Sequence, residues 1–260
     1  MTVGPLIKTW RAKRRLSQLD LALEANVSAR HLSFVETGRS RPSEQMVLHL
    51  AKTLDVPLRE RNRLLLAAGY APHFSQHTLE DEELAPVKQA LDQLLKAHEP
   101  FPALVVDRQW TLIAANGALG PLLEGVAPQL LQPPVNVLRV ALHPEGMAPR
   151  IGNLGEWRAH LLRDLDPDLA ELRQELESYP GPEAPAHNAV FVPLEIDGLR
   201  FLSTRTTFSD SADVTVSELA IEAFYPADEV TRQAIVRARR GDRPSNGDTA
   251  QATYQPQLEA

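Results

Sequence analysis

Residues 26–43 read NVSARHLSFVETGRSRPS, and this stretch decides how the first part of the chain folds. Ser28 is a good helix N-cap, and the helix that follows has Leu32 and Val35 as its next apolar positions. Helical spacing directs three other side chains away from that stripe: Arg30, Ser33 and Phe34. We therefore expect a short helix that buries one narrow stripe and leaves most of its surface facing outward.

The residues before this helix predict two more helices and a tight turn. Residues 4–15 form a first helix, and Ser17 caps a second helix that ends at Asn26. Asparagine tolerates the left-handed conformation that a tight turn between helices requires. The second helix is expected to bury one stripe made of Leu19, Ala22 and Leu23.

The residues after it predict a fourth and a fifth helix. Ser43 caps the fourth helix, whose apolar stripe is Met46, Val47, Leu50, Ala51 and Leu54. The fifth helix runs from Pro57 to Gly69. Two helices joined by a short turn inside a bundle of about five is the arrangement that presents one helix to the DNA major groove. An ordinary helical hairpin is the alternative.

Charge is distributed unevenly along the chain. Residues 1–72 carry 12 Lys and Arg against 6 Asp and Glu, a balance of +6, whereas residues 73–260 carry 15 against 28, a balance of −13. This asymmetry favours an anionic partner for the N-terminal part alone, although a solvated basic surface would have the same composition.

Composition excludes several classes of protein. The chain has no cysteine, which rules out disulfides and thiolate metal sites. The N-terminal residues become charged before a long apolar run develops, and no stretch approaches the roughly 20 apolar residues that span a bilayer. We expect a soluble, cytoplasmic protein without a membrane partner.

Residues 17–72, SQLDLALEANVSARHLSFVETGRSRPSEQMVLHLAKTLDVPLRERNRLLLAAGYAP, closely resemble the DNA-binding domain of Xre-type regulators, which include phage repressors and Cro. Within that family they look like the subgroup related to the methylenomycin regulator MmyB. The resemblance implies a lambda repressor-like domain of five helices over residues 1–72 and a double-stranded DNA operator as partner. It also implies a DNA-contacting set: Gln18, Ser28, Ala29, Arg30, His31, Ser33, Phe34, Arg39 and Arg41.

These residues have different expected roles. Gln18 matches the glutamine that reaches a backbone phosphate, and Arg30 could bind guanine O6 and N7 in a bidentate manner. Phe34 could contact a thymine methyl group, while Arg39 and Arg41 suit phosphates. Phosphate would repel Glu36, so we expect that carboxylate to have a structural role in an ion pair within the domain.

The second half of the sequence predicts a mixed domain. Residues 73–97 form a linker and a connecting amphipathic helix. Within residues 98–238, a hairpin over 102–116 precedes short helices and two clear helices, and three strands follow at 188–196, 199–208 and 216–226. We expect an α+β fold with an antiparallel five-stranded sheet and helices on one face, the order of a PAS-like sensor. Residues 239–260 are expected to be a disordered tail.

Three stretches of this half resemble the ligand-binding domain of the MmyB-like regulators: PALVVDRQWTLIAAN, LHPEGMAPRIGNLGEWRAHLLRDL and LSTRTTF with SELAIEAFYPAD. The resemblance implies a PAS-like cup for a small apolar ligand, with fatty acids as the associated class. The candidate ligand-binding residues are Asn116, Trp157, Arg158 and His160. Arg158 or His160 would bind a ligand carboxylate. Alternatively, Trp157 is core, Arg158 and His160 make structural hydrogen bonds, Asn116 caps a helix, and the domain only dimerises.

The sequence gives little support to an enzyme. It lacks the GxSxG and HExxH motifs and a glycine-rich phosphate loop. His73 and His77 are four positions apart but have no third metal ligand nearby. We expect no catalytic residues, no metal and no cofactor other than a bound fatty acid as effector. The predicted function is a ligand-responsive transcriptional regulator that acts as a homodimer, and the rival is an enzyme targeted to DNA.

Overall fold

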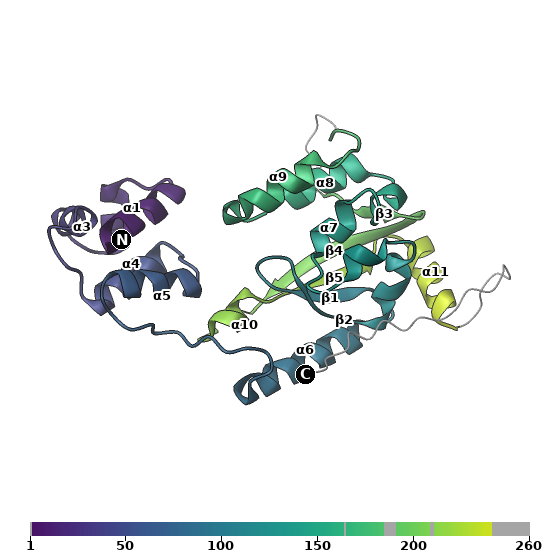
Figure 1. Ribbon diagram of the computed structural model, residues 1–260, viewed down its shortest axis with the longest axis horizontal. Coiled ribbons are helices and arrows are strands. Elements are labelled where there is room, and N and C mark those ends of the chain that lie inside the picture. Colours follow the sequence, from purple (N-terminus) through teal and green to yellow (C-terminus); the bar gives the residue numbers. More distant parts are fainter. Residues whose placement is uncertain (1, 164, 185–190, 209–210, 241–260) are drawn as a thin grey trace. The chain divides into compact units, whose positions relative to one another are not determined.

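The chain folds into two compact units (Figure 1). The computed structural model describes residues 2–163, 165–184, 191–208 and 211–240. Unit 1 contains Met1–Leu84 together with Phe208–Ser217, and unit 2 contains Ala85–Thr207 together with Glu218–Ala260. A segment from the second half of the sequence is therefore part of the N-terminal unit, which the sequence did not predict.

Unit 1 begins with the five helices expected from the sequence. They are α1 (Val3–Lys13), α2 (Gln18–Glu24), α3 (Ala29–Glu36), α4 (Glu44–Thr53) and α5 (Leu58–Ala67). Three of these helices are capped at their N-termini by serine side chains, those of Ser17, Ser28 and Ser43. Asn26 has a φ of 49°, so the left-handed turn between α2 and α3 is confirmed.

The core of this bundle corrects one prediction. Leu21 and Ala22 are buried in α2, whereas Leu19 and Leu23 are 60% and 71% exposed. The prediction was therefore right for Ala22 and wrong for Leu19 and Leu23: α2 has seven residues, and its leucines allow two stripes that differ by a small rotation of the helix. Leu32 and Val35 of α3 are buried as predicted.

Helix α1 approaches α3 closely at a glycine. A Cβ atom at Gly4 would lie 2.3 Å from the carbonyl oxygen of Val35 and 2.7 Å from that of Glu36. Only glycine permits this close approach of the two backbones. The end of α3 therefore packs directly against the start of α1.

Unit 2 is built on a five-stranded antiparallel sheet in the order β2-β1-β5-β4-β3. The strands are β1 (Ala103–Val106), β2 (Leu112–Ala115), β3 (Leu194–Ile196), β4 (Leu199–Thr207) and β5 (Ala220–Pro226). The α+β fold class and the PAS-like sheet are thus confirmed. Strand β5 lies at the centre, where Glu222 is opposite Leu104 on one side and Arg205 on the other.

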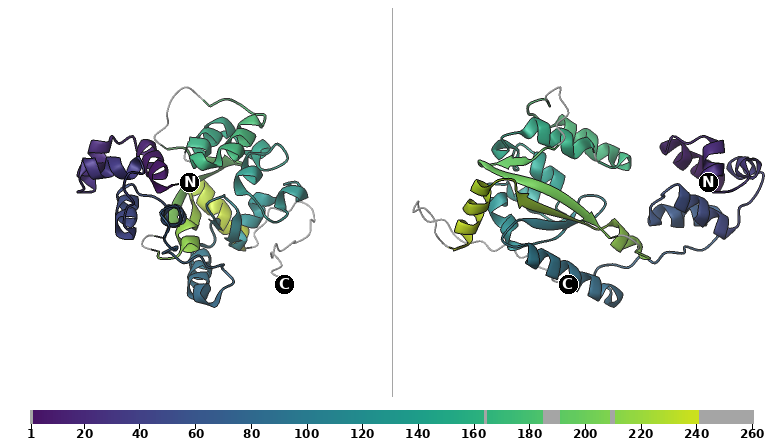
Figure 2. Two further views of the ribbon diagram at one scale, coloured as in Figure 1. Left: turned by 60° about the vertical axis from the view of Figure 1, so that its left-hand side comes forward. Right: turned by 180° about the vertical axis from the view of Figure 1, so that it is seen from behind.

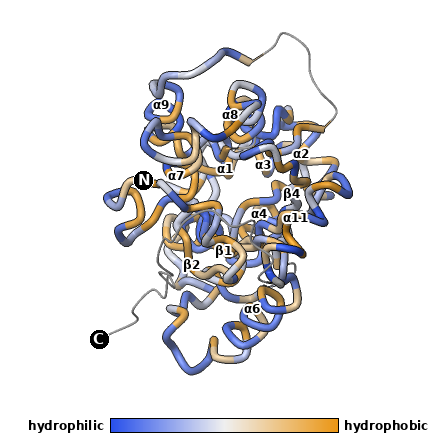
Figure 3. The backbone as a smooth tube through the Cα atoms, turned by 90° about the vertical axis from the view of Figure 1, so that its right-hand side faces the viewer, coloured by the Kyte–Doolittle hydropathy of each residue, from blue (hydrophilic) through white to orange (hydrophobic). Residues whose placement is uncertain are grey.

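Helices cover both faces of this sheet (Figure 1, Figure 2). One face carries α7 (Val137–Leu142), α8 (Leu154–Arg163) and α9 (Ala170–Ser178), whose apolar residues share a core with the sheet. Helices α6 (Ala85–His98) and α11 (Glu229–Arg240) pack on the other side, α6 against β1 and α11 against β4 and β5. Figure 3 shows hydrophilic and hydrophobic stretches alternating along α6, whose Leu91 and Leu95 are buried. The expectation of helices on one face alone was wrong.

Short helical segments complete the fold. The described residues include the 3-10 segments η1 (Glu82–Leu84), η2 (Gly117–Leu123), η3 (Pro128–Leu131), η4 (Ala148–Arg150) and η5 (Pro167–Leu169). Helix α10 (Val214–Glu218) occupies the start of the strand predicted at 216–226, and β3 is shorter than predicted. Residues 188–190 of the predicted third strand and 241–260 of the predicted tail lie outside the described residues. In the described parts of the chain, none of the helices has the length and apolarity needed to cross a bilayer.

Candidate functional sites

The first site is the outward surface of α3 and its N-cap, made of Ser28, Arg30, His31, Ser33 and Phe34; we call it the recognition surface. The predicted contact residue Ala29 is half-buried and packs against the core of the bundle. The Ser28 hydroxyl accepts a hydrogen bond of 3.4 Å from the backbone N–H of His31, so this residue caps the helix. Arg30 is exposed, and its guanidinium lies 5.5 Å from the centre of the half-exposed Phe34 ring. This stacking holds a cation beside an apolar group on one helical face.

A buried carboxylate fixes the other end of α3. Glu36 accepts hydrogen bonds from Nε and Nη2 of Arg11 at 2.7 and 3.0 Å, and from Nε2 of Gln18 at 2.7 Å. Burial raises the pKa of Glu36, but the hydrogen bonds from Arg11 and Gln18 outweigh it, and the pKa lies below its ordinary value. The predicted ion pair is confirmed, with Arg11 as the partner. The amide nitrogen of Gln18 has two N–H donors, and this bond uses one.

The two loop arginines differ in their surroundings. Arg39 is exposed. The guanidinium of Arg41 donates to the carbonyl oxygens of Ala68 and Gly69 at 3.0 and 3.3 Å, and it lies 5.1 Å from the Tyr70 ring centre. Arg41 therefore ties the loop to the end of α5, where backbone carbonyls attract cations. This is a structural role that the sequence did not predict.

The two histidines of the linker have separate partners. His73 Nδ1 lies 3.8 Å from a carboxylate oxygen of Glu44. His77 interacts with Asp213: its backbone N–H and its Nδ1 lie 3.1 and 2.9 Å from Oδ2 of that residue. Within the described residues, no three metal-binding side chains gather into a group. The contact between His77 and Asp213 instead joins the linker to the segment that precedes α10.

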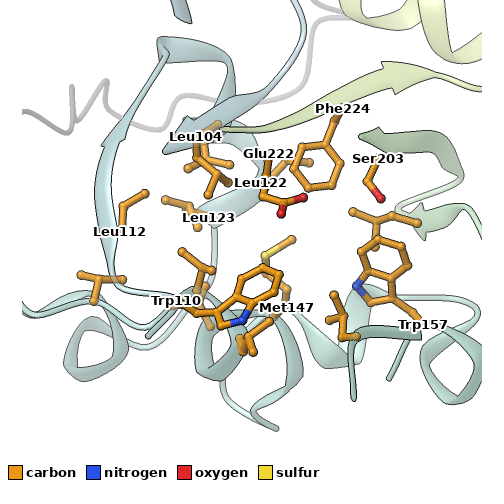
Figure 4. Close-up of a pocket in the computed structure, with 18 of the residues that line it drawn as sticks. Leu104, Trp110, Leu112, Leu122, Leu123, Met147, Trp157, Ser203, Glu222 and Phe224 are labelled. Carbon is orange, nitrogen blue, oxygen red and sulfur yellow. The ribbon is translucent and has the colours of Figure 1, made fainter. Parts of the chain in front are cut away.

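The second site is a cavity of about 250 Å³ in unit 2, between the sheet and helices α7 and α8 (Figure 4). Most of its described lining is apolar: Leu104, Trp110, Leu112, Leu119, Leu122, Leu123, Leu131, Val135, Val137, Leu138, Val140, Ala141, Met147, Trp157, Leu161, Leu194 and Phe224. Four polar residues complete it: His160, Ser203, Arg205 and Glu222. Such a cavity suits a molecule with an apolar body and one polar end.

The polar residues of β4 and β5 form an ion pair at the cavity wall. Nε of Arg205 lies 3.3 Å from Oε1 of Glu222, and the guanidinium lies 4.5 Å from the Trp110 ring centre. The Glu222 side chain is 12% exposed, and among the described residues Oε1 has no hydrogen-bond partner. Burial raises the pKa of Glu222 to about 7, against the opposing charge of Arg205.

The structure brings two of the four predicted ligand-binding residues to this cavity. Trp157 and His160 line it, and their ring centres are 5.2 Å apart. Arg158 does not line the cavity, because it follows Trp157 on α8 and consecutive helical residues point in different directions. The Nη atoms of Arg158 instead donate to the carbonyl oxygens of Tyr179 and Pro180 at 3.0 and 2.8 Å.

Asn116 does not line the cavity either. Its side chain accepts from the backbone N–H of Ala103 at 3.1 Å and donates to the carbonyl oxygens of Leu95 and Phe101 at 3.2 and 2.8 Å. It therefore joins the end of β2 to β1 and α6. The predicted cavity roles of Asn116 and Arg158 are corrected to structural ones.

Four further lining residues were not predicted from the sequence: Trp110, Ser203, Arg205 and Glu222. One signal was present: Glu222 interrupts the apolar run LAIEAFY, and a carboxylate in a central strand is costly unless it has a role. The alternation of β4 and β5 then places Arg205 and Glu222 on the same face, but only once the register between these strands is known.

The two sites define a class of protein: a helix-turn-helix domain on the same chain as a PAS-like domain with a ligand-sized cavity. Comparison with family models agrees. Residues 7–61 match the model described as helix-turn-helix, and residues 87–237 match the MmyB-like transcription regulator ligand binding domain. The chain belongs to the family of MmyB-like transcription regulators, and it is a DNA-binding transcription regulator with a ligand-binding domain.

Other comparisons add little. No curated protein matched the chain. Among solved structures, one described as an RNA-binding light-oxygen-voltage receptor is 14% identical, with 91% of this chain and 62% of that chain covered and a TM-score of 0.23. The chain thus spans less than two thirds of the length of that receptor.

Proposed function

We propose that this regulator binds an operator as a homodimer through the recognition surface, and that a fatty acid in the cavity of unit 2 changes its affinity for DNA. The observation that carries the ligand half is the cavity itself. Its walls are mostly aliphatic and aromatic side chains, and three of its four polar residues, Ser203, Arg205 and Glu222, lie on the neighbouring strands β4 and β5. An aliphatic chain would gain roughly 0.8 kcal/mol per buried CH₂ group there.

The proposal that the recognition surface binds DNA is supported by the packing of α3 in unit 1. The narrow stripe of Leu32 and Val35 faces the core, and Gly4 and Glu36 fix the end of the helix from behind. The side chains that remain outward combine a bidentate donor in Arg30, hydrogen-bonding hydroxyls and an apolar ring in Phe34, which is the chemistry that base edges in the major groove accept. Gln18 and Arg39 are the proposed phosphate contacts.

Dimerisation follows from the small size of one DNA contact. A single helix-turn-helix domain reads a few base pairs, so selectivity calls for two copies on half-sites about one helical turn apart. We place the dimer contact in the acidic C-terminal part, because two basic N-terminal domains would repel each other. Analytical ultracentrifugation of the full chain should show a dimer, and selected operators should contain inverted repeats. A monomer that binds unrepeated sites tightly would contradict this proposal.

The experiment that tests the ligand half is mass spectrometry of small molecules released when the purified chain is denatured. We expect fatty acids among them, and we expect operator affinity to change when dodecanoic acid is added to delipidated protein. If the chain is a dimer, releases no ligand and binds DNA with an affinity that no fatty acid changes, the C-terminal domain only dimerises. Turnover in a metabolite screen would instead favour the enzyme alternative.

A further inference from the structure

Glu222 is placed where a ligand would meet it. It lies in the central strand, between Ile221 and Ala223, whose side chains point to the opposite face of the sheet. Figure 4 shows its carboxyl group directed into the cavity, in the space between Trp110, Met147 and Trp157. Its side chain is almost completely buried, and the fold leaves Oε1 without a hydrogen bond from the described residues.

Its neighbours compensate this carboxylate only in part. From β4, Arg205 approaches Oε1 to 3.3 Å and also stacks on Trp110. From α8, His160 is the other titratable group of the described lining. The remaining elements around the cavity, β1, β2, β3, α7, η2 and η3, contribute apolar side chains to that lining. A buried oxygen with an unused lone pair has a strong requirement for a hydrogen-bond donor.

We propose that Glu222 binds the polar end of the ligand, and that it shares one proton with the carboxyl group of a fatty acid beside the positive charge of Arg205. This assignment rests on the proposed function, because it names the residue that recognises the ligand there. Two carboxyl groups this close cannot both be ionised, so one of them carries the proton. When the acid arrives as its carboxylate, protonated Glu222 donates its O–H, and Arg205 balances the single negative charge that the pair retains.

The pH dependence follows from this arrangement. Because burial holds the pKa of Glu222 near 7, its proton is already in place below that pH. Above it, each bound carboxylate must take up a proton from solvent, and affinity for the acid should fall about tenfold per pH unit. A fatty alcohol has its own O–H donor for ionised Glu222, so its affinity should not fall in the same range.

The test is calorimetric titration of the full delipidated chain with dodecanoic acid and with dodecanol between pH 5.5 and 8.5. In the wild type, we expect the acid-to-alcohol affinity ratio to drop about tenfold per unit above pH 7. In Glu222→Gln the amide donates at every pH, so the acid affinity should become independent of pH. Glu195→Gln, the same change on β3 outside the cavity lining, should keep the wild-type dependence.

His160→Gln separates the second titratable group. If Glu222 holds the proton, the pH dependence survives in His160→Gln even where the affinity itself changes. A wild-type acid affinity that stays flat across the range, a dependence that persists in Glu222→Gln, or one that disappears in His160→Gln would each overturn the assignment. Failure of both the acid and the alcohol to bind at any pH would overturn the proposed ligand class, a result distinguishable from binding without proton linkage.

Discussion

The carboxylate of Glu36 at the end of α3 accepts hydrogen bonds from both Nε and Nη2 of Arg11 on α1, at 2.7 and 3.0 Å. The Glu36 side chain is 1% exposed and that of Arg11 is 12% exposed, so this pair is largely removed from water. The amide of Gln18 adds a third donor from α2. Three helices of unit 1 thus meet at one charge, which orients the helix that carries the recognition surface.

Removing that charge should destabilise unit 1. In Glu36→Ala, Arg11 keeps its buried charge and its hydrogen bond to the carbonyl oxygen of Leu16 but loses the opposite charge. Breaking a buried ion pair in this way costs roughly 3 to 5 kcal/mol. Amide hydrogen exchange in α1–α5 should report the loss. Asp55→Asn, in the exposed pair with Arg14, is the matched control and should change protection by less than about 1 kcal/mol. Equal effects of both substitutions would contradict a special role for Glu36.

The same carboxylate predicts a response to acid. Because the pKa of Glu36 is lowered in the folded chain, its contribution to stability is present above the ordinary value of 4.5 and is lost as pH falls through the folded value. The hydrogen-exchange protection factors of unit 1, which correct for the intrinsic pH dependence of exchange, should therefore fall in the wild type below about pH 4.5. Glu36→Gln should show a smaller change over this window, although it is less stable throughout.

Arg30 of the recognition surface and Arg39 of the loop after α3 should affect DNA binding in different ways. Arg30→Ala should cost about 1 to 3 kcal/mol at the operator and relax one base position. Arg39→Ala should weaken all sequences alike and reduce the salt slope by about one unit. Affinity measured on operator and scrambled DNA at several salt concentrations distinguishes these outcomes, and a uniform loss from Arg30→Ala would remove its assignment to base reading.

Arg41→Ala should behave differently from both. The Arg41 guanidinium donates hydrogen bonds to the carbonyl oxygens of Ala68 and Gly69. Removing this side chain should therefore lower the stability of unit 1 by about 1 to 3 kcal/mol. The salt slope of DNA binding should be unchanged. A slope reduced by one unit, with stability intact, would show that Arg41 binds phosphate after all.

Glu222 should make unit 2 less stable at alkaline pH. Its folded pKa is raised from an ordinary 4.5 to about 7, so its contribution is fully present below the unfolded value and is lost as pH rises through 7. One pKa unit corresponds to about 1.4 kcal/mol, so the loss approaches about 3 kcal/mol. Thermal unfolding of wild type and Glu222→Gln should diverge between pH 5 and 8, and parallel curves would show that Glu222 titrates normally.

The N-terminal domain was largely predictable because its signals are local. Serine caps at Ser17, Ser28 and Ser43 and the left-handed Asn26 each act within a few residues of the chain. The errors there concern partners distant in sequence. The rotation of α2 depends on what packs against Leu21, and the engagement of Arg41 depends on the position of Gly69, 28 residues later.

The cavity was harder to predict for the same reason. The strands and helices of unit 2 follow from alternation and helical periodicity, but the inward direction of each residue depends on register and on helix rotation. One position along α8 separates Trp157, which lines the cavity, from Arg158, which binds carbonyl oxygens of the loop after α9. Arg205 and Glu222, 17 residues apart in the chain, become neighbours only through the pairing of β4 with β5.

The assignment of Phe208–Ser217 to unit 1 has a consequence for the synthesis of the protein. The five N-terminal helices leave the ribosome first, yet His77 finds its partner Asp213 only after residues 85–213 have been added. At about 5 to 20 residues per second, that interval is on the order of ten seconds. During that time Ser75 and His77, which follow the last DNA-binding helix, lack their contacts with Asp213, Val214 and Thr215. A translational pause before residue 208 would therefore lengthen the interval in which unit 1 is incomplete.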